Sequence, residues 1–201
     1  GVSDFDIRSG NTLHEPALIE GDRLKTFDVV LANPPYSIKK WNREAWQSDQ
    51  WGRNSLGTPP QGRADYAFFQ HILKSMAPKT GRCAILFPHG VLFRQAEVEL
   101  RRNLVETGMV ECVLGLGPSL FYNAAMEGCV VICRSQKPKG REGKTLFIDA
   151  VHEIAKENTQ SFLRSEHQLR IRAAYQAFEN ETAFAAVATT EEILANGGDR
   201  T

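Results

Sequence analysis

The sequence lacks several features that would assign it to a class of protein at once. No apolar run approaches the ~20 residues that a membrane-spanning helix needs. The first residues, GVSDFD, have neither the basic start nor the apolar core of a secretory signal peptide. The 24 Lys and Arg residues balance 24 Asp and Glu residues, so bulk charge does not hold this chain on nucleic acid, although a local basic patch stays open. We therefore expect a cytoplasmic protein without a membrane partner.

The four cysteines form neither a zinc-binding pattern nor a disulfide framework. A zinc site needs close Cys or His pairs such as C-x2-C, and only Cys129 and Cys133 lie near each other. Positions i and i+4 of a strand share a face, so these two side chains are expected to pack in the core. Cys83 and Cys112 also lie within apolar runs. We predict buried, reduced thiols and no bound metal, as is typical of a cytosolic protein.

Apolar runs that end at Gly or Pro predict alternating strands and helices. The predicted strands cover residues 27–32, 82–87, 110–114, 129–133 and 145–148, and the predicted helices cover residues 64–77, 95–106, 166–178 and 190–195. The alternation over residues 27–114 favours an α/β fold with parallel strands. Irregular connections between the last three strands indicate an antiparallel edge. Residues 37–63 form a long polar segment, which is unusual in a compact domain unless the segment is functional or mobile.

The most informative segment is NPPY, residues 33–36, directly after the first predicted strand. One interpretation is a strand that two prolines end, with Tyr36 closing the edge of the core. The other is chemical, because ligands of open α/β sheets bind beyond the carboxyl ends of the strands. An exocyclic amine on an aromatic ring is a poor nucleophile, because its lone pair is delocalised into the ring. Two hydrogen-bond acceptors on its N–H groups would localise that lone pair.

In the chemical interpretation each residue of the motif has a task. The side-chain oxygen of Asn33 and the carbonyl of Pro34 accept hydrogen bonds from the amine and stabilise the positive charge that grows as nitrogen attacks a methyl donor. Proline fixes φ and so holds the carbonyl in place. Tyr36 offers a flat face for stacking, and a base inside a duplex must be flipped out to reach it. The candidate catalytic residues are Asn33, Pro34, Pro35 and Tyr36.

These four residues resemble the catalytic motif of amino-group methyltransferases that use S-adenosylmethionine. A wider similarity, from about residue 5 to the end, narrows the family. Residues 62–73, 81–84, 87–93, 120–122, 146–150 and 191–198 are similar to the modification subunit of type I restriction-modification systems. The resemblance implies a partial Rossmann-like S-adenosylmethionine-dependent methyltransferase fold of the α/β class, with a mixed sheet, an antiparallel edge and a helical C-terminal extension.

The resemblance also implies a function, namely N6 methylation of a flipped adenine in duplex DNA, in a complex with specificity and restriction subunits. By position, Asn33 and Pro34 would hold the amine and Tyr36 would stack, while Asn11 and Asn33 would contact the cofactor. Residues 5–8 resemble the strand before the adenine contact of the cofactor, where Asn11 stands in place of the usual Asp. Residues 123–127 also depart from the family's pattern.

Part of the family's machinery has no counterpart among the 201 residues. The glycine-rich cofactor loop, the acidic residue for the cofactor ribose and the helical N-terminal domain are missing. We therefore expect residues 1–150 to be the C-terminal part of the catalytic domain and residues 151–201 to begin a helical extension. This piece alone is expected to be inactive and to bind S-adenosylmethionine weakly or not at all. We also expect self-association through the unpaired edge of residues 27–32, or residues 1–26 covering that edge.

Two other functions stay open at this point. The chain can belong to a methyltransferase for another amine, in protein glutamine or in RNA, or be a non-catalytic remnant that only docks partners. Trp41, Trp46 and Trp51 either contact an extruded base or pack internally. His89 is a candidate pocket residue, whereas His71 is expected to be a helix histidine with a satisfied ring. Six arginines either face DNA phosphates or the specificity subunit, or are solvated: Arg94, Arg101, Arg102, Arg164, Arg170 and Arg172.

Overall fold

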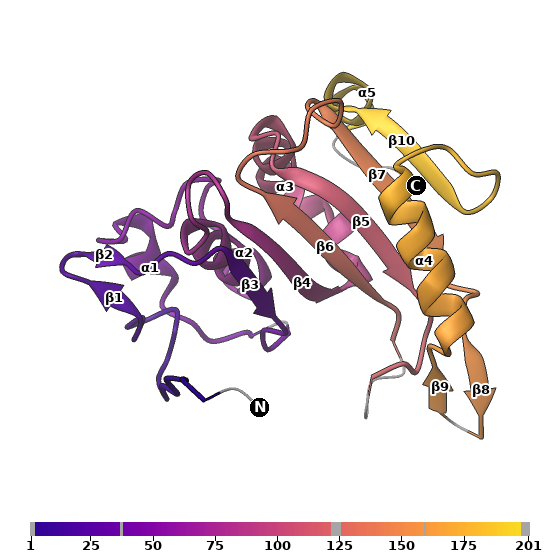
Figure 1. Cartoon of the computed structure of the whole chain (residues 1–201). Coiled ribbons are helices and arrows are strands. Elements are labelled where there is room, and N and C mark those ends of the chain that lie inside the picture. Colours follow the sequence, from indigo (N-terminus) through magenta and orange to yellow (C-terminus); the bar gives the residue numbers. More distant parts are fainter. Residues whose placement is uncertain (1–2, 37, 122–125, 159, 198–201) are drawn as a thin grey trace.

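A computed structural model describes residues 3–36, 38–121, 126–158 and 160–197. The strands of its central sheet are β3 (Val29–Ala32), β4 (Arg82–Pro88), β5 (Val110–Leu116), β6 (Gly128–Arg134), β7 (Lys144–Ala150) and β10 (Ala185–Thr189). They lie in the order β10-β7-β5-β6-β4-β3 (Figure 1). The helices are α1 (Arg43–Gln47), α2 (Asp65–Lys74), α3 (Val98–Glu106), α4 (Ser165–Ala177) and α5 (Thr190–Ala195), with short 3-10 turns at His89–Leu92 and Gln95–Glu97. Two small hairpins pair β1 (Ile19–Glu20) with β2 (Arg23–Leu24) and β8 (Ala155–Glu157) with β9 (Gln160–Phe162).

The five strands and four helices predicted from the apolar runs are present, and their ends differ from the predicted ends by a few residues. The mixed sheet is also confirmed, because β3 is parallel to β4 and β5 is parallel to β7. The expected antiparallel edge is present as well, although the antiparallel strand β6 lies inside the sheet, between β4 and β5. The reason is that β6 is apolar on both faces, as a strand covered on both sides must be. The antiparallel edge strand is β10, which pairs with β7.

Helices cover the two faces of the sheet, and the alternation along each strand decides which residue meets which helix. On one face, Phe69 of α2 and Leu104 of α3 pack with Ile85 and Val131 in a single apolar cluster. On the other face, Ala174 of α4 packs with a second cluster formed by residues of β5, β7 and β10. Figure 1 shows α4 in front of the sheet, with α2 and α3 behind it. The core is therefore built in two layers around the strands.

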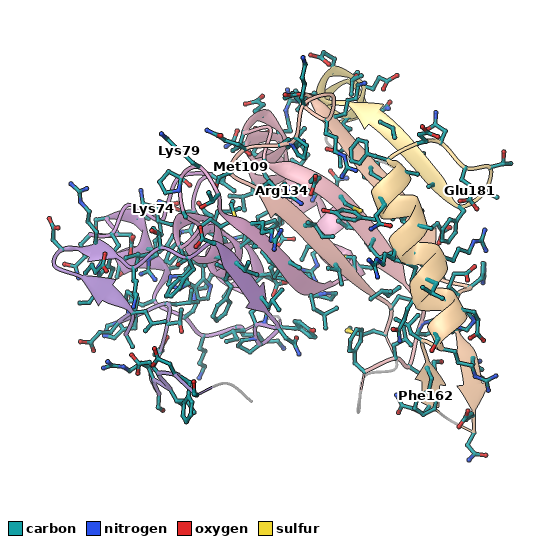
Figure 2. The ribbon with its side chains drawn as sticks, in the orientation of Figure 1. Lys74, Lys79, Met109, Arg134, Phe162 and Glu181 are labelled. Atoms are coloured by element: carbon teal, nitrogen blue, oxygen red, sulfur yellow. The ribbon has the colours of Figure 1, made fainter. Side chains whose placement is uncertain are left out.

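A buried ionic network fastens α4 to its face of the sheet. The register shifts at Val110–Cys112, and the fully buried carboxylate of Glu111 accepts hydrogen bonds from the helix and from the sheet. Its donors are Arg134 Nε at 2.6 Å, Arg141 Nη1 at 3.2 Å and the Tyr175 hydroxyl at 2.5 Å. Arg134 stands on β6, where Figure 2 shows it on the sheet. The network therefore joins β5, β6, α4 and the turn before β7.

The four thiols are buried and free, as predicted. Cys129 and Cys133 lie on one face of β6 and belong to the same apolar cluster, which confirms that they pack in the core. Cys83 stands directly opposite Cys133 in the register of β4 and β6. Burial raises the pKa of the Cys112 and Cys129 thiols to about 12.

The strand that precedes the NPPY motif is the other edge of the sheet. β3 pairs with β4, and among the described residues no segment pairs with its second edge. Leu31 is 77% exposed and Val29 is 48% exposed. Residues 5–8, expected to form a strand, have no regular structure, and residues 3–26 do not cover the edge of β3 within the described part of the chain. Self-association through this edge stays a prediction.

The segment after residue 150 contains more than the expected helices. It carries α4 and α5, but it also carries the β8–β9 hairpin and β10. The small side chains of Ala185 and Ala188 are buried as β10 extends the sheet along β7. A domain boundary near residue 150 stays a proposal. Within the residues that the structure describes, no helix is both long and apolar enough to cross a membrane.

Candidate functional site

The NPPY motif forms a turn at the carboxyl end of β3. Asn33 follows the last residue of that strand directly, and its side chain is exposed, whereas Pro34 is buried. The chain then turns back, so that the Tyr36 hydroxyl donates a hydrogen bond to Asn33 Oδ1 at 2.6 Å. Burial raises the pKa of Tyr36, which keeps this hydroxyl protonated. The structure thus brings together the amide and the aromatic ring that the sequence singles out.

A hollow of about 310 Å³ opens beside this turn. Asn33, Pro34 and Pro35 form one side of it, and α2 contributes Phe68 and His71. Thr12, from the N-terminal segment, also lines it. Three segments that are distant in sequence therefore meet at the end of β3, where an open α/β sheet binds its ligands.

Asn11 lines a second hollow, of about 470 Å³, next to the first. Trp41 and Gln61 of the long loop line it too, and Phe68 borders both hollows. The Asn11 side-chain oxygen accepts a hydrogen bond from the His14 backbone N–H at 3.2 Å, and so holds the turn on which it stands. Asn11 and Asn33 thus lie in adjoining hollows rather than in one.

Arg53 connects the segments that line the two hollows, and it was not among the candidate residues of the sequence analysis. Its side chain is buried, and it forms an ion pair with Asp49 at 2.6 Å. The guanidinium carbon lies over the ring of Trp46, 4.6 Å from its centroid, and over the ring of Trp51, 5.0 Å from its centroid. It also donates to the backbone carbonyls of Thr12 and Leu13. The sequence signal for Arg53 is Asp49, which lies four residues earlier and between Trp46 and Trp51. A loop as long as residues 37–63 needs an internal contact of this kind to stay ordered.

His71 faces Arg53 and is kept neutral. Its Nδ1 lies 3.3 Å from Arg53 Nη1, and since arginine can only donate, Nδ1 is the acceptor and the ring proton is on Nε2. Burial, and then the charge of Arg53, lower the pKa of His71 to about 4. The expectation of a satisfied helix histidine is confirmed. The sequence did not predict that His71 also lines the hollow beside Asn33.

Trp46, Trp41 and His89 differ in whether they are buried and in whether they line a hollow. Trp46 is buried, which supports internal packing, whereas Trp41 lines the second hollow and donates from its indole N–H to the Gln61 carbonyl at 2.9 Å. His89 is not among the described residues that line either hollow, and its Nδ1 lies 3.2 Å from a Glu127 carboxylate oxygen. Residues 122–125, which include most of the altered segment 123–127, lie outside the described residues.

At least three of the six arginines form ion pairs with acidic side chains. Arg94 pairs with the buried Asp65 at 2.6 Å, and Arg101 is buried and donates to the Arg94 carbonyl. Arg164 pairs with Glu157, and Arg170 pairs with Glu153 and Glu181. Arg102 and Arg172 are exposed. Arg94 and Arg101 therefore belong to an internal network rather than to a basic face.

Comparison with known proteins finds a matching family and similar sequences. The sequence profile of the family described as N-6 DNA Methylase matches residues 1–201. The MjaIX methylase subunit, of a type I restriction enzyme of Methanocaldococcus jannaschii, is 31% identical over 209 residues and covers 97% of this chain, which spans 37% of that protein. The HindI methylase subunit of Haemophilus influenzae is 29% identical over 205 residues, which is 96% of this chain and 44% of that protein. The chain thus spans less than half the length of these relatives.

Solved structures agree with the sequence comparison. The methyltransferase subunit of a type I restriction-modification system from Streptococcus thermophilus superposes with a TM-score of 0.85 at 34% identity, over 94% of this chain and 40% of that one. A putative class I S-adenosylmethionine-dependent methyltransferase from Listeria monocytogenes superposes with a TM-score of 0.53 at 15% identity, over 76% of this chain and 43% of that one. The second similarity bears on the fold alone.

Proposed function

The chain belongs to the N-6 DNA methylase family, and on that premise we propose that it holds the target adenine in a DNA adenine-N6 methyltransferase, the modification subunit of a type I restriction-modification system. Its sheet is that of a class I S-adenosylmethionine-dependent methyltransferase. One observation carries the proposal, which is the NPPY turn at the end of β3, with Asn33 beside an open hollow.

In this proposal the residues of the turn act on the adenine amine. Asn33 Oδ1 accepts a hydrogen bond from the amine, and the Pro34 carbonyl accepts the other. Both acceptors stabilise the charge that develops on nitrogen during methyl transfer. The Tyr36 ring stacks on the flipped base, which offsets part of the cost of unstacking it from the duplex. The charged methylated amine loses its proton readily, so this arrangement needs no strong general base.

The second hollow fits the cofactor by its chemistry. It combines an amide side chain, Asn11, with the aromatic rings of Trp41 and Phe68, and such a set matches the polar edge and flat faces of an adenine ring. When bound, S-adenosylmethionine supplies the activated methyl group. Asn11 would hydrogen-bond as an uncharged group, and the Asn33 side of the first hollow would meet the methyl-bearing end.

Partners are proposed from the names of the relatives, which are methylase subunits of type I restriction enzymes. We propose that this protein works with a specificity subunit and a restriction subunit on duplex DNA in the cytoplasm. The 24 basic residues are balanced by 24 acidic residues, so this chain has no excess of positive charge for binding DNA phosphates. This supports the proposal that a partner subunit makes many of the contacts with DNA.

The test uses the protein at its full natural length together with its specificity subunit. Radiolabelled methyl groups of S-adenosylmethionine should enter duplex DNA as N6-methyladenine, identified by mass spectrometry of the nucleosides. Asn33→Ala should abolish the incorporation, whereas Asn196→Ala, which changes an exposed amide in the last turn of the described chain, should not. Label in RNA or in protein glutamine would favour another amine as the substrate. No label in any of the three would favour a non-catalytic docking role.

A further inference from the structure

We propose that Arg53 is a positioning residue that holds the segment of residues 11–13 against α2 and the long loop, and so keeps the two hollows in shape for the methyl donor. The part that concerns the methyl donor rests on the proposed function. The part that concerns the segment itself stands on geometry alone.

The guanidinium of Arg53 uses all of its N–H groups. Nε and Nη2 donate to Asp49 Oδ1 at 3.0 and 2.6 Å. Nη1 donates to the Thr12 carbonyl at 2.8 Å and faces His71 Nδ1 at 3.3 Å. Nη2 also donates to the Leu13 carbonyl at 2.9 Å. A lysine ammonium has three donors and no planar fork, so it cannot reproduce this pattern.

Residues 11–15 depend on this side chain for their attachment. Their other hydrogen bonds in the described part of the chain are local, from the backbone N–H groups of His14 and Glu15 to the Asn11 carbonyl at 3.0 and 2.8 Å. The two bonds from Arg53 are those that join the segment to a later part of the sequence. Without them, the turn that carries Asn11 is no longer fixed to the rest of the protein, and its own two hydrogen bonds open more often.

Each group that Arg53 holds, apart from its counter-ion, borders a hollow. Thr12 and His71 line the hollow beside Asn33, and Leu13 lines the hollow that contains Asn11. Arg53 also fixes the ring proton of His71 on Nε2, because Nη1 faces Nδ1. A buried ion pair contributes little to stability compared with apolar packing, so stability alone is a weak reason for this arrangement.

The test compares Arg53→Lys with Arg141→Lys in the full-length protein. Arg141 is a suitable control because it also pairs with a buried carboxylate and lies over aromatic rings, but in the network that fastens α4. Hydrogen exchange of the His14 and Glu15 amides should become at least ~10-fold faster in Arg53→Lys and stay unchanged in Arg141→Lys. Unchanged exchange in Arg53→Lys overturns the inference, whether or not the protein binds S-adenosylmethionine.

A second measurement separates positioning from a purely structural role. The dissociation constant for S-adenosylmethionine, from equilibrium dialysis, should rise roughly 10- to 100-fold in Arg53→Lys, because a segment that is no longer held in place must be ordered when the cofactor binds. Saturating cofactor should restore most of the methylation rate. Faster exchange with an unchanged dissociation constant overturns the assignment to the cofactor. A wild-type protein that binds no S-adenosylmethionine counts against the proposed function, while the exchange data still decide whether Arg53 holds the segment.

Asp49→Asn provides a second variant if Arg53→Lys does not fold. It keeps the shape of the counter-ion but removes its charge, so it should loosen Arg53. The same two measurements should change in the same direction by a smaller factor. A folded Asp49→Asn protein with wild-type exchange at both amides also contradicts the inference.

Discussion

The hydroxyl of Tyr36 is hydrogen-bonded to the side-chain oxygen of Asn33, which is an atom that the proposed substrate would also bind. It donates to Asn33 Oδ1 at 2.6 Å, and the proposed chemistry assigns that oxygen to the adenine amine. An amide oxygen has two lone pairs, and we expect the amine of a flipped base to compete with the hydroxyl for the one that it occupies. Tyr36→Phe removes the donor and keeps the ring for stacking. Tyr36→Ala removes both.

The size of the effect follows from the environment of this hydrogen bond. A hydrogen bond between neutral groups contributes about 0.5–1.5 kcal/mol net, and the exposure of Asn33 argues for the middle of that range or below. About 1 kcal/mol corresponds to roughly a fivefold change in a binding constant. Tyr36→Phe should therefore bind target DNA up to about fivefold more tightly, with no loss in the rate of methyl transfer. Tyr36→Ala should bind more weakly, because stacking on an aromatic ring contributes about 1–3 kcal/mol per base.

The assay measures fluorescence anisotropy of the full complex on its target duplex, and on the same duplex without the target base. Tightening in Tyr36→Phe should appear only when the target adenine is present. Tyr175→Phe is the matched control, because it removes a hydroxyl that donates to Glu111 in the α4 network. A drop of more than about tenfold in single-turnover rate for Tyr36→Phe would refute the reasoning, since the hydroxyl would then act in methyl transfer. Equal tightening on both duplexes would refute it as well.

Two further predictions concern stability. Folding lowers the pKa of His71 from 6.5 to about 4, so between these pH values the unfolded chain binds a proton at His71 and the folded chain does not. The free energy of unfolding should therefore fall by up to about 3 kcal/mol as the pH drops from 6.5 to 4. In urea unfolding, His71→Gln should lose this dependence on pH. An identical slope in the variant would contradict this cause. Glu111→Gln leaves Arg134 and Arg141 without their shared carboxylate, and should destabilise the protein by about 3–5 kcal/mol in denaturant titration, whereas the exposed Glu142→Gln should have little effect. A loss below about 1 kcal/mol would show that the network is not needed to hold α4.

Local patterns in the sequence were enough to place five of the six described strands of the central sheet, four of the five described helices and the NPPY segment, while the short helix α1 was missed. Runs such as residues 82–87 are apolar and end at proline or glycine, so both their type and their limits follow from neighbouring residues. β10 was not predicted, because its short, alanine-rich sequence carries little strand signal and gains its place by pairing with β7. The position of β6 inside the sheet is likewise a result of packing on both faces.

The parts of the site that could not be predicted depend on contacts between distant segments. Arg53 reaches Thr12, Leu13 and His71, and none of these partners lies near it in the sequence. Asn33 and Tyr36, in contrast, are close enough in sequence for one turn to bring them together. A motif of adjacent residues can therefore be recognised from sequence, whereas the side chains that hold it in place become visible only in the folded chain.

The pairing of β3 with β4 also sets the order in which the site can form during synthesis. β3 begins at Val29, and its partner strand begins at Arg82, after the long loop and α2. At ~5–20 residues per second, a ribosome releases β3 and the NPPY motif several seconds before β4 is available to pair with them. Throughout that interval Leu31 and its neighbours present an apolar strand with both edges free. The amine site is therefore assembled only after the helix that lines it and the strand that supports it have left the ribosome.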